Sequence, residues 1–281
     1  MKISIVTINY NNVEGLKRTL ASVAEQSYRD LEHIIIDGGS TDGSVDVIKE
    51  YVAANPNNDP FFKHTIKGVS EKDNGIYNAM NKGIRKAAGA YVQILNSGDI
   101  LAASNVTERM VAEIEKAEYP ELLYGNMIKK DYATGKILGK SREVEYSLRQ
   151  YYASTMNHDC CYFRRDLFET YGLYDENLKI VSDWKWFLQA IGIGQVKPEY
   201  VDIDVTIFDA SGISETNLEL RNKERRQVLE DVLPPTVLAD YDKHAFDMEQ
   251  MDRLRKRHLY WFVYFIERVL FKFEKWGILK K

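Results

Sequence analysis

Three aspartates, each placed just after a strand-like run, are the residues of this chain whose spacing first suggests chemistry. Asp37, Asp73 and Asp99 follow the second, third and fourth of these runs. Helix-like runs separate the strands, an order that predicts a parallel sheet, and parallel sheets bind ligands beyond the carboxyl ends of their strands. We therefore expect the three carboxylates to line one crevice.

The first two aspartates stand in loops that contain glycine. In residues 37–44, Asp-Gly-Gly-Ser-Thr-Asp-Gly-Ser, the glycines let the backbone approach a ligand, and Asp37 can accept a hydrogen bond from a base N–H or a ribose hydroxyl. The alternative is a tight turn whose Asp42 or Ser44 only caps the next helix. We assign the cap to Asp42 and the ligand to Asp37. Asp73 is a helix cap or a ligand group, and its place on the shared rim favours the ligand.

The third aspartate closes the turn Asn96-Ser97-Gly98-Asp99. A divalent cation that bridges two phosphates, such as Mn²⁺ or Mg²⁺, needs oxygen ligands of this kind. A lone aspartate at a strand end is also a common turn residue, but this one follows a nearly all-apolar strand at the predicted mouth of the site. We expect Asp99 to be partly exposed on the rim and to bind the cation.

The elements that must position these residues follow from hydrophobic periodicity. Strands and helices are expected to alternate over residues 3–8, 13–27, 31–36, 44–54, 65–69, 75–88 and 91–95. Later elements are a hairpin at 122–132 and 136–139, strands at 160–164 and 201–208, a helix at 182–191, and mostly helix from 217. We predict an α/β fold with a Rossmann-like half and a mixed sheet. The expected domains are 1–215, with halves 1–100 and 101–215, and a C-terminal helical extension at 216–281.

Composition and charge exclude several classes of protein. With 281 residues and 44% hydrophobic content, the chain can bury one large core. A formal charge of −4 argues against a nucleic-acid partner. Cys160 and Cys161 are adjacent, a spacing that suits neither a disulfide framework nor a zinc site, so we expect buried thiols in a reducing compartment. The first residues enter a strand without the pattern of a signal peptide, and we expect a cytoplasmic protein.

Four segments together resemble family 2 glycosyltransferases with the GT-A fold. They are residues 3–11 (ISIVTINYN), 37–43 (DGGSTDG), 73–83 (DNGIYNAMNKG) and 95–99 (LNSGD). The similarity spans about residues 1–210 and is particularly close to bacterial enzymes of exopolysaccharide and colanic-acid biosynthesis. It implies an inverting, metal-dependent transferase that moves a sugar from a nucleotide diphosphate donor, most simply a UDP-sugar, to a hydroxyl of a glycan or lipid-linked acceptor.

The resemblance also implies roles for single residues on the donor side. Thr7 and Asn9 would line the base pocket, and Asp37 would contact the uracil or the ribose. Asp73 would contact the nucleoside, and Lys82, on the polar side of the next helix, would join the same nucleotide-sugar site.

Residues 96–99 take the place of the family's Asp-x-Asp metal motif, so Asn96, Ser97 and Gly98 would face the donor and Asp99 would bind the metal. The chain departs from the pattern because Asn96 and Gly98 stand where many relatives carry acids. One carboxylate with diphosphate oxygens and waters still holds Mg²⁺ or Mn²⁺, with weak affinity before the nucleotide binds. We expect Asn96→Asp to tighten metal binding.

An inverting transfer also needs a base for the acceptor hydroxyl, and a helix-opening Ser-Asp pair followed by Trp and Phe matches the family here. Residues 181–187, Val-Ser-Asp-Trp-Lys-Trp-Phe, fit this pattern, with Asp183 as the base or, alternatively, as a helix cap. Trp184 and Trp186 stack on sugars or pack in the core. His158 resembles the family's segment below the acceptor pocket.

Two further features concern closure over the donor and the number of sugars transferred. Residues 208–214 resemble the segment that closes over the donor in relatives, and they equally suit an ordinary loop. The Gln-x-x-Arg-Trp motif of processive synthases is absent from the sequence, so we expect one sugar per encounter.

The C-terminal tail mixes aromatic and basic residues. From Met251 onward, nine Lys or Arg stand against three Asp or Glu. Charges at 267 and 268 interrupt the apolar run, which is then far shorter than the roughly 20 residues that span a bilayer. Residues 258–278 would lie in an anionic membrane interface, which would make the chain a peripheral protein on the cytoplasmic face of the inner membrane. Alternatively, they would pack against another part of the protein or against a second subunit of a homo-oligomer.

Two other functions share parts of this pattern. A sugar-nucleotide pyrophosphorylase has a similar βαβ start, but its Gly-rich loop with Arg and Lys is replaced here by Asn9-Tyr10-Asn11-Asn12. A non-catalytic nucleotide-sugar-binding protein would account for the single carboxylate in the metal motif. Donor hydrolysis in the presence of manganese separates the enzyme from the binding protein.

Overall fold

The structure, a computed structural model, describes residues 1–54, 64–194, 196–210, 217–257 and 260–275. The chain forms two compact units, Met1–Val228 and Leu229–Lys281. The predicted boundary between residues 215 and 216 falls in the segment 211–216, which lies outside the described residues. That boundary therefore stays a prediction.

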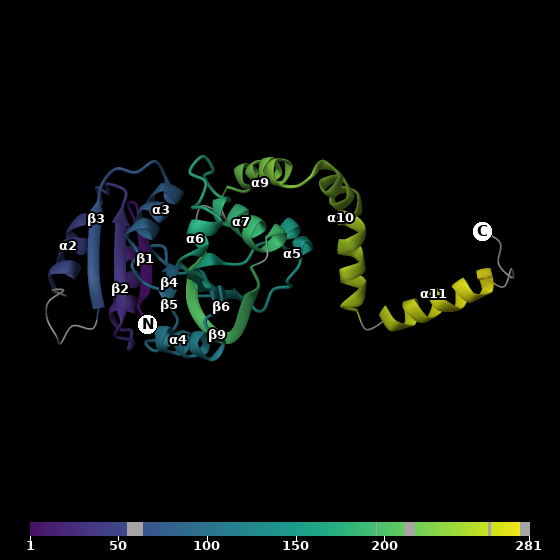
Figure 1. The fold of residues 1–281 in the computed structure, drawn as a ribbon, viewed down its shortest axis with the longest axis horizontal. Helices are drawn as coiled ribbons and strands as arrows, with labels where there is room; N and C mark the ends of the chain where they lie inside the picture. Colours follow the sequence, from purple (N-terminus) through teal and green to yellow (C-terminus); the bar gives the residue numbers. More distant parts are fainter. Residues whose placement is uncertain (55–63, 195, 211–216, 258–259, 276–281) are drawn as a thin grey trace. The chain divides into compact units, whose positions relative to one another are not determined.

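The first unit is built on one sheet whose N-terminal half is parallel (Figure 1). The parallel strands stand in the order β3-β2-β1-β4. Their bounds are Ile3–Asn9 for β1, Leu31–Asp37 for β2, His64–Ser70 for β3 and Tyr91–Ile94 for β4. Every residue of β1 and β2 is buried, as expected for strands covered on both faces. The predicted α/β fold with a Rossmann-like half is confirmed.

Helices cover both faces of these strands. α1 (Val13–Ala24) and α2 (Ser44–Ala54) pack together through Leu16, Leu20 and Ile48. α3 (Ile76–Lys86) lies on the opposite face, because Ile5 of β1 joins the core with α1 whereas Val6, the next residue, meets α3. At that contact Gly83 has no room for a Cβ, which would stand 2.2 Å from Val6 Cγ1.

The second half of the sheet is mixed. Antiparallel β8 (Cys161–Arg164) joins β4 to β6 (Leu122–Lys130), and β9 (Pro198–Asp209) runs parallel to β6. The predicted hairpin is present as β6 and β7 (Ile137–Lys140), and β5 (Ile100–Leu101) pairs with the end of β9. Cys160 and Cys161 are buried free thiols, as predicted.

Several helices complete the chain. α4 (Val106–Lys116), α5 (Leu148–Ala153) and α6 (Leu167–Thr170) are not among the predicted elements. α7 (Ser182–Phe187) continues as a π-helix over Leu188–Ile193. The C-terminal part is helical, as predicted, with α9 (Leu218–Val232), α10 (Pro235–Arg255) and α11 (Tyr260–Lys275). In the described part of the chain no helix is long and apolar enough to cross a membrane.

One buried histidine makes stability depend on pH. His33 of β2 is fully buried, where its ring bonds Thr7 Oγ1 at 2.9 Å and Tyr51 Oη at 3.2 Å. Burial, and to a lesser extent the charge of His64, lower the pKa of His33 from 6.5 to about 3. In the unfolded chain His33 takes up a proton near pH 6.5, whereas in the folded chain it stays neutral down to about pH 3. The free energy of unfolding therefore falls as the pH drops below 6.5.

We predict that His33→Gln removes this pH dependence. Between pH 7 and pH 5 the wild-type chain should lose about 2 kcal/mol more unfolding free energy than the variant. Urea unfolding at the two pH values measures the difference, with the exposed His244→Gln as the matched control. Equal losses in wild type and variant would contradict the assignment.

Candidate active site

The carboxyl ends of β1 and β4 open into a cavity of about 490 Å³. Six residues expected at the site line it: Asn9, Asn96, Ser97, Asp99, His158 and Asp183. The first and last of them, Asn9 and Asp183, stand 174 positions apart in the sequence, and the sheet brings them together because these strands end at one rim.

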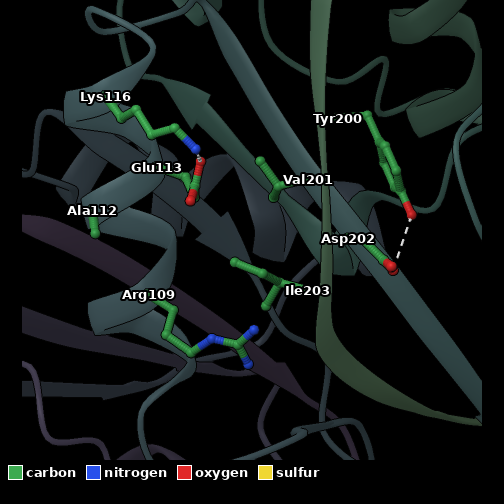
Figure 2. Close-up of a pocket in the computed structure, with 8 residues that line it drawn as sticks. All are labelled: Arg109, Ala112, Glu113, Lys116, Tyr200, Val201, Asp202 and Ile203. Atoms are coloured by element: carbon green, nitrogen blue, oxygen red, sulfur yellow. Dashed lines mark hydrogen bonds and ion pairs between the residues drawn. The ribbon is translucent and has the colours of Figure 1, made fainter.

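A second depression of similar volume lies between α4 and β9 (Figure 2). Two pairs of its polar side chains interact with each other: Lys116 pairs with Glu113 at 2.9 Å, and the Tyr200 hydroxyl donates to Asp202 at 3.3 Å. None of the predicted site residues lines it. The candidate chemistry therefore belongs to the strand-end cavity.

Asp37 organises its own loop. Its carboxylate is fully buried and accepts hydrogen bonds from the Asn9 amide, the Ser40 N–H and hydroxyl, the Gly39 N–H and the Ser70 hydroxyl. Burial acts to raise the pKa of Asp37, but these hydrogen bonds outweigh it and the pKa is lowered. A contact with a ligand would therefore require this loop to give up one of its bonds.

Asp73 lies against that loop. A Cβ on Gly38 would stand 2.5 Å from Asp73 Oδ2 and 3.1 Å from the Tyr10 ring, so any other residue there would displace the Asp73 side chain. The Asp73 carboxylate also accepts from the Gly75 N–H at 3.0 Å, ahead of α3. Asp73 thus reaches the rim beside Tyr10, which lines the cavity and is exposed.

Five predicted donor-site residues do not line the cavity: Thr7, Asp37, Asp73, Lys82 and Gly98. Thr7 is fully buried against His33. Lys82 forms an ion pair with Glu71 at 2.8 Å and also donates to the Lys72 carbonyl. Thr7 supports the strand below the site, and Lys82 fixes the loop that carries Asp73.

The turn 96–99 is held from α1. Asn12 Nδ2 donates to the Ser97 carbonyl at 3.0 Å, and the Gly98 N–H donates to Thr19 Oγ1 at 3.0 Å. Gly98 has a φ of +110°, a conformation that L side chains rarely adopt. These constraints direct Asn96 toward His158 and turn Asp99 inward.

The prediction that Asp99 is partly exposed is wrong. The side chain is only 3% exposed, because β9 crosses the turn and the Asp209 N–H donates to Asp99 Oδ1 at 2.8 Å. Burial, followed by the negative charge of Asp159, raises the pKa of Asp99 well above its usual value. Asp209 itself pairs with Arg18 at 3.1 Å. The result is a buried carboxylate at the cavity wall with acidic neighbours.

Asp183 is held by hydrogen bonds to both oxygens. The Tyr77 hydroxyl donates to Oδ1 at 2.8 Å, and His158 Nδ1 lies 3.1 Å from Oδ2. Burial acts to raise the pKa of Asp183, but the contacts with His158 and Tyr77 outweigh it and keep the pKa below its usual value. The carboxylate is therefore ionised and fixed in direction at the cavity wall, the state a general base requires.

His158 connects Asp183 to the turn 96–99, because its Nε2 lies 3.2 Å from Asn96 Nδ2. Asn96 Oδ1 is then buried without a hydrogen-bond partner, and so is Asn9 Oδ1 across the same cavity. Unpaired buried acceptors are costly, so two of them on residues that line one cavity point to a donor group or cation that the bound ligand supplies.

The two tryptophans differ in their surroundings. Trp186 is buried among Phe163, Phe168 and Tyr171 and does not line the cavity, so the structure gives it the packing role. Trp184 is also buried, but it borders a smaller cavity next to Asp183, and its indole N–H donates to the Tyr151 carbonyl.

Sequence reasoning missed three side chains of the site. Tyr77 is the hydrogen-bond donor to Asp183, and Tyr10 and Lys179 line the cavity. Helical spacing alone predicts that Tyr77 lies on the same inward face as Met80. It does not predict the contact with Asp183, which stands 106 positions further along the chain.

The side chains of the site supply few of the ligands that a metal ion needs. Within the described residues no three His, Cys, Asp or Glu side chains are grouped to hold one. Asp99 and the unpaired Asn96 oxygen nevertheless supply two hard oxygen donors at one wall. The donor set therefore fits a cation that takes its remaining ligands from a bound diphosphate and water.

Comparison with known proteins identifies the family. Residues 4–172 match glycosyl transferase family 2. The chain belongs to this family. It is 30% identical over 217 residues to an uncharacterized glycosyltransferase of Mycobacterium tuberculosis, covering 75% of this chain and 76% of that protein. It is 27% identical over 209 residues to a PGL/p-HBAD biosynthesis glycosyltransferase of Mycobacterium bovis, covering 74% and 77%.

Solved structures support the fold of this family 2 glycosyltransferase. S. aureus TarS 1–349 in complex with UDP-GlcNAc matches with a TM-score of 0.64 at 17% identity, over 82% of this chain and 64% of that one. A mannosyltransferase from Pyrobaculum calidifontis in complex with GDP-Man and Mn²⁺ matches with a TM-score of 0.60 at 17% identity, over 84% and 66%. The predicted GT-A fold is confirmed.

Proposed function

We propose that this glycosyltransferase moves one sugar, with inversion, from a UDP-sugar to a hydroxyl of a glycan or lipid-linked acceptor in cell-surface polysaccharide biosynthesis. The observation that carries the proposal is the ionised Asp183 carboxylate, fixed by Tyr77 and His158 at the cavity wall. An acceptor hydroxyl beside Asp183 gives up its proton as its oxygen attacks the sugar from the side opposite the leaving diphosphate.

The donor would occupy the strand-end cavity. Tyr10, exposed on the rim beside Asp73, offers a ring face for the base, and Asn9 offers an unpaired acceptor for a donor hydroxyl or N–H. Lys179 lines the same cavity and supplies positive charge for the diphosphate. The UDP-GlcNAc and GDP-Man complexes of the structural neighbours are consistent with a nucleotide-sugar donor in this fold.

Asp99 and the Asn96 amide oxygen would hold Mn²⁺ or Mg²⁺ in the presence of the donor. When bound, such a cation stabilises the charge that develops on the departing diphosphate. The Mn²⁺ in the Pyrobaculum mannosyltransferase complex supports this assignment. Asp99 then has the charge partner that its buried surroundings lack.

The function is tested by measuring release of UDP from a panel of UDP-sugars with Mn²⁺, with and without short-chain lipid-linked acceptors. Acceptor-dependent release, with a product of inverted anomeric configuration by NMR, is expected. A protein that binds UDP but never releases it from a donor, whatever acceptor is added, would be a binding protein instead.

The membrane proposal rests on α11. Four of its described aromatic side chains, Trp261, Phe262, Phe265 and Phe271, are more than 60% exposed. The tail from Met251 carries a charge of about +6 (nine bases minus three acids), which complements an anionic surface. The aromatic rings suit headgroup depth, and the lipid-linked acceptor would be within reach on the cytoplasmic face.

We predict that the full chain sediments with phosphatidylglycerol liposomes at low salt. Truncation at Arg257 should release it, and raising the salt concentration should weaken the binding of the full chain because charge attraction is screened over about 10 Å at 0.1 M. Neutral phosphatidylcholine liposomes are the control. A full chain that stays in the supernatant would mean that α11 is a packing surface, and its oligomeric state would then be measured.

A further inference from the structure

A second, smaller cavity adjoins the proposed donor site. Its volume is about 160 Å³, against about 490 Å³ for the strand-end cavity, and the two share His158, Ile180, Asp183 and Phe208 as lining residues. Asp183 therefore belongs to the walls of both. A hydroxyl that enters the smaller cavity can reach the proposed base without passing through the donor cavity.

Two arginines of α9, Arg221 and Arg225, line this smaller cavity one helical turn apart. The guanidinium of Arg225 lies over the Trp184 ring, 4.1 Å from its centroid, and its Nη2 donates to the Tyr152 carbonyl at 3.1 Å. Trp184 is itself fixed by its bond to the Tyr151 carbonyl. Arg225 is thus oriented before any ligand arrives.

The charge of Arg225 has no ion-pair partner among the described residues, and its guanidinium donates to the main-chain carbonyls of Tyr152 and Ser154. The two acids that line the cavity are engaged elsewhere, Asp183 with His158 and Asp159 with the Thr206 hydroxyl. Burial, and then the charge of Arg221, lower the pKa of Arg225 to about 10. An oxyanion in the cavity would relieve both effects, and arginine matches its geometry.

We propose that this cavity is an acceptor subsite for an anionic group, a phosphate or carboxylate close to the accepting hydroxyl, which Arg225 and Arg221 bind. The inference rests on the proposed function in one respect, that the strand-end cavity takes the donor. It names the acceptor class: an anionic glycan or a phosphate-linked lipid carrier.

The test is a titration of the full ¹⁵N-labelled chain with inorganic phosphate at constant ionic strength, in the presence of saturating UDP. The indole N–H resonance of Trp184, assigned with Trp→Phe substitutions, reports on the cavity. We expect a saturable shift whose Kd rises about tenfold or more in Arg225→Gln and less in Arg225→Lys, which keeps the charge but not the planar fork. Lys223→Gln, on an exposed side chain of the same helix, should leave the Kd unchanged.

The titration is repeated without UDP, and three outcomes overturn the proposal: no saturable shift in the wild-type chain under either condition, the same Kd in a folded Arg225→Gln variant, or a saturable shift that appears only when UDP is left out. The last would assign the arginines to the donor diphosphate. The titration needs no turnover, so it stands even if no UDP-sugar is hydrolysed. A kinetic arm with an alkyl glycoside and its 6-phosphate should show a raised KM in Arg225→Gln for the phosphorylated acceptor alone.

Discussion

Replacing Asp183 by asparagine is expected to lower the rate of sugar transfer by about a hundredfold to ten-thousandfold, because it removes the proton acceptor while keeping the size of the side chain. The Tyr77 hydroxyl can still donate to the amide oxygen, and the new amide N–H can donate to His158 Nδ1 when that nitrogen carries no proton. The Kd for UDP should stay within about twofold of the wild-type value, since the proposed role of Asp183 is to act on the acceptor.

The matched control is Asp175→Asn. Asp175 pairs with Lys185 of α7 at 2.6 Å but lines neither cavity, so this variant removes a carboxylate next to the same helix without touching the base. Its transfer rate should remain close to that of the wild-type chain. If UDP binding collapses together with turnover in Asp183→Asn, Asp183 is a structural or donor-binding residue and the assignment as base fails.

The parallel half of the fold was predictable because its strands are apolar on both faces and its helices carry one apolar stripe. The helix at 44–54 matches α2 to the residue, and the other predicted elements of this half differ by a few residues at their ends. Where the sheet becomes mixed, the pattern weakens. β9 is partly exposed along its length and its register with β6 shifts twice, and the strand predicted at 201–208 covers only part of it, Pro198–Asp209.

α4 was not predicted, although the sequence carries the hydrophobic periodicity of a helix there. Val106, Met110, Val111 and Ile114 are buried and recur with the spacing of one helix face. β5, by contrast, is two residues long and exists only because it pairs with the end of β9. Such an element depends on a tertiary contact and leaves no periodic trace in the sequence.

In the site, too, some residues could be predicted from local sequence and others depend on tertiary contacts. Of the three aspartates that strand-end reasoning placed on one rim, only Asp99 lines the cavity, and Asp183, which also lines it, was predicted from the family resemblance. The burial of Asp99 depends on β9 crossing over the turn, 110 positions further along the chain. The partners of Asp183, Tyr77 and His158, come from α3 and from a 3₁₀ turn ahead of β8. Local sequence encodes neither contact, because both are set by how the two halves of the sheet meet.

Asp99→Asn should abolish most of the manganese-dependent hydrolysis of the donor. The amide keeps the volume and can still accept the Asp209 N–H, but it loses the charge that a cation needs at this wall. Loss of several kcal/mol of stabilisation on the leaving diphosphate corresponds to a rate reduction of about a hundredfold or more. The fold should survive, since a neutral amide relieves the repulsion from Asp159 that burial intensifies.

Two measurements separate the metal role from a structural one. The unfolding midpoint of Asp99→Asn should equal or exceed that of the wild-type chain, and a Mn²⁺ titration in the presence of UDP should show weaker binding. Asn96→Asp should act in the opposite direction, because a second carboxylate in place of the unpaired amide oxygen adds charge for the cation. A variant that unfolds early yet keeps wild-type manganese affinity would make Asp99 a structural residue and leave the cation to other ligands.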